Sequence, residues 1–257
     1  MVLTIRDGEG NVVRRMTGPT GAGFHRVTWN LRHASSLPVT GGGGGGGGFG
    51  GGGGGFGGGQ APLAMPGTYQ VTLSQRINGV ETPVGDPQTF SAQPVGTSSL
   101  PPADRAALLA FQRETAALQR GVMGAVQSVT ETNRRLDLLR QAVDDAPGAD
   151  AALRARVREL GRRLDALQVR LSGDRTVSRR SEPTDPAITN RVQSIVSGHW
   201  NSTSNPTDTH RRSYTIARAD FARFMAEYRA LVETDLRAVE AAADAAGVPW
   251  TPGRMPQ

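Results

Sequence analysis

The most constraining feature of this chain is a heptad pattern that keeps its register from Leu108 to Val143. Mostly apolar residues recur there at alternating spacings of three and four, which is typical of a helix that packs lengthwise against other helices. At 1.5 Å per residue, a helix over 103–145 would be roughly 50 Å long or more. The pattern predicts a coiled-coil seam made of Leu108, Phe111, Thr115, Leu118, Val122, Ala125, Val129, Thr132, Leu136, Leu139 and Val143.

The same spacing returns after Pro147-Gly148, which predicts a helical hairpin with a second helix over 149–172. A polar connection then leads to a short helix over 186–197. A last long helix is expected over 213–246, with Gly247 as its C-terminal stop and 247–257 as a tail. Small residues in the first seam should accept aromatic side chains from this last helix. The expected inward positions are Leu153, Val157, Leu160, Leu164, Leu167 and Leu171; Ile188, Val192, Ile195 and Val196; and Tyr214, Ala217, Phe221, Phe224, Tyr228 and Leu231.

The first 95 residues follow a different period and predict a small antiparallel β-domain of five or six strands. Residues 2–16 are expected to form a hairpin around the turn Asp7-Gly8-Glu9-Gly10. Apolar and polar residues alternate over 23–32 and again over 67–77, and Asn78-Gly79 is a strong signal for a two-residue hairpin turn. The core is predicted to consist of Val27, Trp29, Leu31, Tyr69, Val71 and Leu73.

A glycine tract at 41–59, interrupted only by Phe49 and Phe56, falls inside this β-domain as a loop between strands. A phosphate-binding loop needs a few glycines at set positions before a helix start, whereas this tract leads into Gln60-Ala61-Pro62, so a solvated loop is the interpretation. Residues 96–102 are rich in Pro, Ser and Thr and are expected to link the β-domain at 1–95 to a helical bundle at 103–246. The predicted class is α+β with two domains.

The charge pattern gives little support to a nucleic-acid partner. The net charge is +6, and the 29 basic residues include no lysine, which indicates a compositional bias rather than a selected guanidinium site. Arginine pairs could contact phosphates or an anionic surface, but on the helices they lie between seam positions and beside acidic residues, as on a solvated face. These pairs are Arg134-Arg135, Arg162-Arg163, Arg179-Arg180 and Arg211-Arg212.

No catalytic, cofactor-binding or metal-binding set stands out, and none is predicted. The chain has no cysteine, and its histidines lack the spacing of metal ligands. The match of Asn201-Ser202-Thr203 to the glycosylation sequon is uninformative. Residues 1–15 do not have the apolar core of a signal peptide, and no stretch approaches the roughly 20 apolar residues of a membrane span. The four histidines are His25, His33, His199 and His210.

The N-terminal segments resemble the Ig-like module typified by the flagellar hook-capping protein. That module has a strand, a D-x-x-G-x-V-V-R turn and strand, G-x-H-x-V-x-W, and a late G-x-Y strand. The resemblance implies a β-sandwich and no activity. The matching positions here are Asp7, Gly10, Val12, Val13, Arg14, Gly23, His25, Val27, Trp29, Gly67 and Tyr69.

The layout of nearly the whole chain resembles the C-terminal region of bacterial sortilin-like or BNR-repeat β-propeller proteins, often labelled glycosyl hydrolases. It combines this module with W-N-L-R at 29–32, the heptad helices and G-V-P-W-T-P-G-R at 247–254. The S-x-D-x-G-x-x-W boxes of the propeller do not occur here, and the glycine tract replaces a short connection. The resemblance implies a non-catalytic accessory segment of an exported protein that is periplasmic or extracellular, and it transfers no catalytic residue.

Three functions are therefore open. The leading hypothesis is a segment that contacts its own propeller domain or a protein partner and has no cofactor. The first alternative is a part of a glycoside hydrolase whose catalytic propeller is missing from this chain. Met1 would then be an internal start or the end of an incomplete gene model. The second alternative is binding of nucleic acid or an anionic surface through the arginine pairs.

Overall fold

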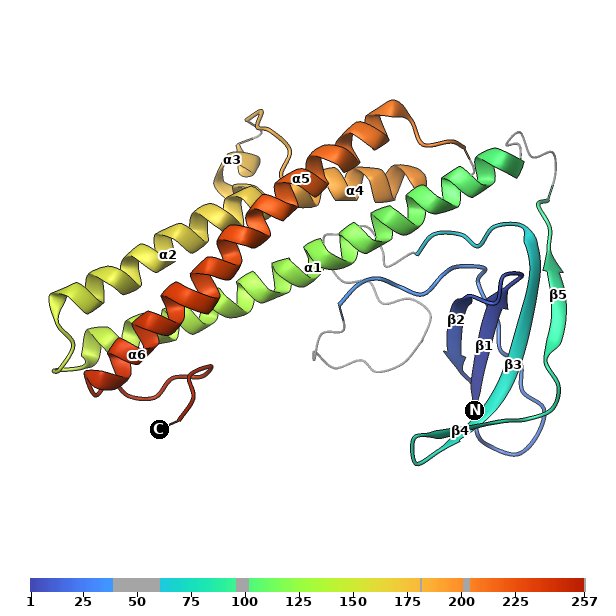
Figure 1. Ribbon diagram of the computed structural model, residues 1–257, viewed down its shortest axis with the longest axis horizontal. Helices are drawn as coiled ribbons and strands as arrows, with labels where there is room; N and C mark the ends of the chain where they lie inside the picture. The colour runs from blue at the N-terminus through green and yellow to red at the C-terminus, as the bar shows by residue number, and fades with distance from the viewer. Residues whose placement is uncertain (39–60, 96–101, 181, 201–203, 257) are drawn as a thin grey trace. The chain divides into compact units, whose positions relative to one another are not determined.

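The computed structural model describes residues 1–38, 61–95, 102–180, 182–200 and 204–256. Its class is α+β, as predicted: a five-stranded antiparallel sheet and a set of helices (Figure 1). The chain divides into two compact units, which we call the sheet unit (Met1–Ala117 with Ile195–Asp208) and the helical unit (Leu118–Ser194 with Thr209–Gln257). The predicted glycine loop at 41–59 and nearly all of the predicted linker at 96–102 lie outside the described residues.

The sheet has the order β2-β1-β3-β4, and β5 also pairs with β3. Strand β3 is the longest and pairs with three others, so it is the centre of the sheet. Strands β4 and β5 pair with opposite ends of β3, β4 at Ser74 to Ile77 and β5 at Gly67 to Val71. The strand bounds are β1 Val2–Asp7, β2 Val12–Thr17, β3 Gly67–Ile77, β4 Val80–Pro83 and β5 Gln88–Ala92.

Both predicted hairpin turns are confirmed. In the turn between β1 and β2, the Asp7 carboxylate accepts hydrogen bonds from the backbone N–H groups of Glu9 (3.1 Å) and Asn11 (2.8 Å). In the turn between β3 and β4, Asn78 and Gly79 both have positive φ angles, +50° and +85°. A turn with two such residues matches the right-handed twist of the strands, and Asn and Gly adopt that backbone at low cost.

The core of the sheet unit is small and aromatic. Ile5, Val13 and Tyr69 are buried. The rings of Trp29 and Tyr69 meet edge to face with centroids 5.3 Å apart, and Phe90 lies 5.9 Å from Tyr69. The other side chains packed here are Met16, Ala64, Val71 and Ala92. The prediction that Tyr69 and Trp29 belong to the core is confirmed, with Trp29 half-buried.

The predicted strand over 23–32 is wrong. This segment forms no strand, and among the described residues it makes a single isolated β-bridge, between Arg32 and Leu63. The Trp29 indole N–H turns back to donate to the Arg32 carbonyl at 2.9 Å. Leu31, expected in the core, is 45% exposed and has a positive φ of 55°. An alternating pattern can form a strand only beside a partner strand, and here the segment packs on the sheet through Trp29 instead.

The helices lie close to the ranges expected from the heptad pattern. All the seam positions predicted for the first two helices are buried, and so are those of the short fourth helix. The helix expected over 213–246 begins earlier, at Asp208, and an additional five-residue helix, α3, lies in the expected connection. The bounds are α1 Pro102–Asp145, α2 Ala151–Ser172, α3 Arg175–Arg179, α4 Ile188–His199, α5 Asp208–Ala230, the π-helix η1 Leu231–Leu236, and α6 Arg237–Ala245.

Aromatic residues of α5 pack against the small residues of α1 in the helical unit, as predicted. Phe221, Phe224 and Tyr228 stack in a row, with centroids 6.1 Å and 5.6 Å apart. The Tyr228 hydroxyl lies 2.7 Å from the Thr132 hydroxyl and 2.8 Å from that of Ser128. Thr132 of the seam and the nearby Ser128 therefore satisfy the hydroxyl group that the aromatic row buries.

A π-helix corrects the register of this last helix. The buried residues Leu231 and Leu236 are five positions apart, whereas Leu236, Val239 and Ala243 return to spacings of three and four. An uninterrupted α-helix would turn the residues after Leu231 away from the core. The wider π turn accommodates one extra residue and keeps both stretches on the buried side.

Two glycines of α1 provide a matched test of this packing. A Cβ added at Gly121 would lie 3.0 Å from the Phe221 ring, whereas one added at Gly124 would meet nothing within 4 Å. Alanine stabilises a helix by up to about 1 kcal/mol relative to glycine. We expect Gly124→Ala to raise the free energy of unfolding by about that amount and Gly121→Ala to gain clearly less. Urea unfolding of the two variants measures the difference, and equal gains would contradict the packing of Phe221 on Gly121.

The segment after Gly247, predicted as a tail, folds back on α6. Arg254 is 6% exposed, and its guanidinium pairs with Asp244 and donates to the Pro249 carbonyl at 2.8 Å. The Trp250 indole N–H donates to the Arg254 carbonyl at 3.0 Å. Gly253 sits so close to Arg135 that an added Cβ would lie 2.8 Å from its side chain. These contacts order the segment as part of the helical unit.

Candidate interaction groove

The hairpin of α1 and α2 brings two charged helix faces together in the helical unit. Asp150 caps α2 by accepting a hydrogen bond from the Leu153 N–H at 2.7 Å. At Gly148 in the connection, an added Cβ would lie 2.4 Å from the Ala246 carbonyl oxygen, so the turn requires glycine. The bidentate ion pair of Arg135 with Glu240, with both N–O distances 2.6 Å, ties α1 to α6. The closed end of the hairpin therefore packs against the end of α6.

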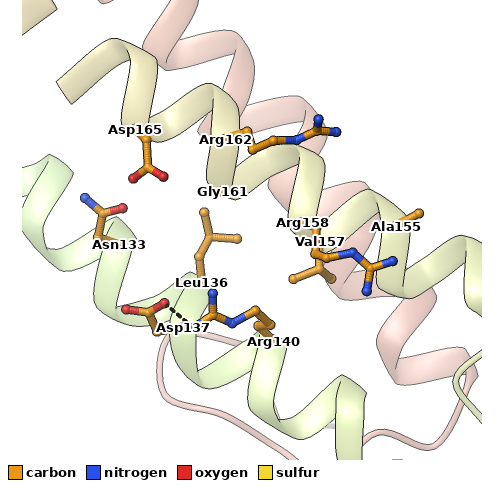
Figure 2. A pocket seen from close by; sticks show the side chains of 10 residues that line it. All are labelled: Asn133, Leu136, Asp137, Arg140, Ala155, Val157, Arg158, Gly161, Arg162 and Asp165. Atoms are coloured by element: carbon orange, nitrogen blue, oxygen red, sulfur yellow. Dashed lines mark ion pairs between the residues drawn. The ribbon is translucent and has the colours of Figure 1, made fainter. Parts of the chain in front are cut away.

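A groove of about 600 Å³, which we call the α1–α2 groove, opens between these helices (Figure 2). Leu136 and Val157 form its apolar floor and are only 4% and 3% exposed. Gly161 leaves a gap in the wall, because an added Cβ there would meet nothing within 4 Å. The remaining lining residues are Asn133, Asp137, Arg140, Ala155, Arg158, Arg162 and Asp165.

The rim of the groove carries charges of both signs. Arg140 pairs with Asp137 at 3.1 Å, and Arg162 pairs with Glu159. Arg158 and Asp165 are exposed and have no ion-pair partner within the described ranges. The groove therefore offers an apolar floor, paired charges at its edges and two charged groups available to a partner.

This geometry suits binding better than hydrolysis. Glycoside hydrolysis needs two carboxyl groups that flank the sugar, one of them shielded from water so that it stays protonated. The Asp137 side chain is 68% exposed and is paired with an arginine. Asp165 is exposed as well. Neither carboxyl group has the burial that a general acid requires.

Four of the eight arginines in the pairs named from the sequence form ion pairs with carboxylates of the same chain. Arg135 pairs with Glu240 and Arg163 with Asp235 at 2.8 Å. Arg162 and Arg180 pair with Glu159 and Glu182. Arg211 and Arg212 lie in the first turns of α5. Because guanidinium groups held by internal carboxylates are less available to phosphates, this arrangement favours the solvated-face interpretation.

The four histidines are dispersed. His25 contacts the Gly21 carbonyl at 2.8 Å, and His199 is buried with its ring 5.5 Å from that of Phe111. His210 lies in α5. Across the described part of the chain, no group of three or more His, Cys, Asp or Glu residues could hold a metal ion. The sequon at 201–203 lies outside the described residues.

The sheet unit contains a second, smaller cavity that the sequence did not indicate. Its volume is about 270 Å³, and Asp7, His33, Tyr69 and Arg113 contribute to its lining. Arg113 pairs with Asp7 at 3.5 Å. Burial lowers the pKa of His33, the Arg113 guanidinium lowers it further, and the Asp7 carboxylate raises it. Burial also raises the pKa of Tyr69. These residues come from four separate segments, so no local pattern links them.

The lowered pKa of His33 predicts a loss of stability in acid. The unfolded chain, in which His33 has its ordinary pKa of 6.5, takes up the proton first. The contribution of neutral His33 is therefore complete above pH 6.5 and is lost as the pH falls below it toward the folded-state pKa. We expect His33→Gln to lose less unfolding free energy than the wild type between about pH 7.5 and about pH 5, measured in urea.

His25→Gln, at an exposed imidazole of the same segment, serves as the control for this measurement. The difference between the two variants gives the part of the pH dependence that belongs to His33. Equal pH dependence in His33→Gln and the wild type would show that His33 takes up its proton equally in both states.

No helix in the described ranges is both long and apolar enough to cross a membrane. Comparisons of the chain with protein-family models, with curated proteins and with solved structures found no match.

Proposed function

We propose that this chain is a non-catalytic accessory segment that makes protein contacts through its helical half. The α1–α2 groove carries the proposal: it is open, has an apolar floor, and has two charged groups that form no ion pair with any described residue. Protein interfaces combine such a buried apolar centre with a polar rim. Its two exposed carboxylates lack the burial of a general acid, which favours a binding surface over a sugar cleft.

The finer architecture belongs to the same proposal. We assign the sheet and the Trp29 side chain that packs on it to the Ig-like module that the sequence resembles, and the buried heptad seam to a coiled-coil bundle. On that resemblance the chain is the C-terminal part of an exported BNR-repeat or sortilin-like propeller protein. Its first partner would then be the propeller domain of the same protein.

Two measurements test this function. The in-frame sequence upstream of Met1 should encode repeated S-x-D-x-G-x-x-W boxes. That propeller, produced separately, should bind the full chain with a Kd in about the micromolar range by calorimetry, or roughly −8 kcal/mol. An unrelated upstream gene, or a propeller that shows no heat of binding, would contradict the assignment.

The hydrolase alternative is tested on the full chain alone. We expect no release of reducing sugar from glycoside substrates at any concentration of the protein. Hydrolysis that disappears in Asp137→Asn or Asp165→Asn, while circular dichroism stays unchanged, would overturn the non-catalytic assignment.

A further inference from the structure

Two exposed charges of opposite sign face the α1–α2 groove from one helix. Arg158 and Asp165 are seven residues apart on α2, which is two helical turns or about 10.5 Å along the axis. The other charged residues that line the groove are paired: Asp137 with Arg140, and Arg162 with Glu159. Within the described ranges, Arg158 and Asp165 are the charged residues of the groove that have no ion-pair partner.

An apolar recess lies between these charges. Leu136 points from α1 toward Gly161 of α2 in Figure 2, and Val157 lies beside it. Gly161 stands midway between Arg158 and Asp165 in the sequence, and the space where its side chain would be is empty. The space beside Gly161 is therefore open to a side chain from outside the chain.

We infer that the α1–α2 groove binds an amphipathic helix of a protein partner. The partner helix carries a carboxylate opposite Arg158, a basic group opposite Asp165, and a large apolar side chain between them that enters the gap at Gly161. This inference rests on the proposed function and names the chemistry of the partner. Charges at i and i+7 with an apolar residue at i+3 or i+4 lie on one face of a helix, so a helix matches all three features.

Two other occupants match the groove less well. A nucleic acid would place its phosphates beside Asp137 and Asp165, which line the same groove. The α2 helix of a second copy, lying antiparallel, would match the two charges but has Gly161 and Arg162 between them, and neither fills an apolar gap. Sedimentation of the full chain at several concentrations tests for this second case. If the chain forms concentration-dependent dimers that Arg158→Glu abolishes, the occupant of the groove is a second copy and not a partner helix.

A helical-peptide display library provides the probe. Peptides randomised at i, i+3, i+4 and i+7 are selected on the full chain. We expect selected peptides to carry an acidic and a basic residue at the outer positions and a large apolar residue between them. Synthesised with a fluorescent label, they should bind at least about tenfold more weakly to the double variant Arg158→Glu/Asp165→Arg. Exchanging the two peptide charges should restore that binding.

The gap is tested separately with Gly161→Leu, which fills the recess and does not disfavour the helix. It should weaken peptide binding by about tenfold or more while circular dichroism stays unchanged. Ala166→Leu, at an exposed position of α2 outside the groove lining, is the matched control and should bind as the wild type.

Selection of no peptide, or of peptides whose affinity is the same for the charge-exchanged chain, would overturn the inference. Failure here is distinct from failure of the proposed function. A propeller that binds the helical half outside the groove would leave the proposed function standing. If the peptides bind as expected but the propeller does not associate, the groove is a helix-binding site and the propeller is not its partner.

Discussion

Replacing Leu139 by aspartate should lower the free energy of unfolding of the helical unit by roughly 4 kcal/mol or more. Leu139 is a seam position of α1 and is fully buried. An aspartate there would have to enter an apolar environment without a partner or push the helices apart, and either costs several kcal/mol. Typical domains are stable by only 5–15 kcal/mol, so we expect a large fall in the circular dichroism melting temperature of the full chain.

Arg134→Ala on the same helix is the control. Arg134 is exposed on the outer side of α1, and surface substitutions of this kind usually change stability by no more than about 0.5 kcal/mol. Similar melting temperatures for the Leu139 and Arg134 variants would mean that the heptad positions do not form a packed seam. The conclusion that α1 packs on α2 and α5 would then be wrong.

Trp29→Ala should have the largest effect in the sheet unit, about 3 kcal/mol, at the lower end of the range for aromatic truncation because the ring is only half-buried. The indole packs edge to face on Tyr69 and Phe90, with centroids 5.3 Å and 6.1 Å away, and also donates to the Arg32 carbonyl. The substitution removes both ring contacts and uncovers one face of the sheet. Hydrogen exchange followed by mass spectrometry should show faster exchange in β3 and β5.

Phe24→Ala is the matched control, because Phe24 lies in the same segment and is fully exposed. It should leave exchange in the sheet unchanged. Unchanged protection of β3 and β5 in Trp29→Ala would show that Trp29 does not belong to the core of the sheet unit.

The turns and the helix positions could be predicted because their causes are local. Asp7 accepts hydrogen bonds from residues two and four positions away, and Asn78-Gly79 needs only its own backbone preference. A helical seam repeats every three to four residues, so all its predicted positions from Leu108 to Val143 are buried as expected. The aromatic row of α5 was predictable for the same reason.

Contacts between distant segments were decided by the tertiary structure. Residues 23–32 alternate like a strand, yet Leu31 has a positive φ and Trp29 covers the sheet, because strand formation depends on a free neighbouring strand and not on alternation alone. The π-helix at 231–236 depends on which side of the last helix is buried.

The α1–α2 groove and the cavity around His33 have the same origin. The sequence by itself determined that α2 has a buried apolar face and a charged outer face. Which charges pair with each other, and which are left facing Gly161, depends on how α2 is placed against α1 and α6. In the same way, Asp7 and Arg113 meet across more than a hundred residues of chain. Periodicity specifies the face of an element, whereas a site depends on the distance between elements, and only the packed chain sets that distance.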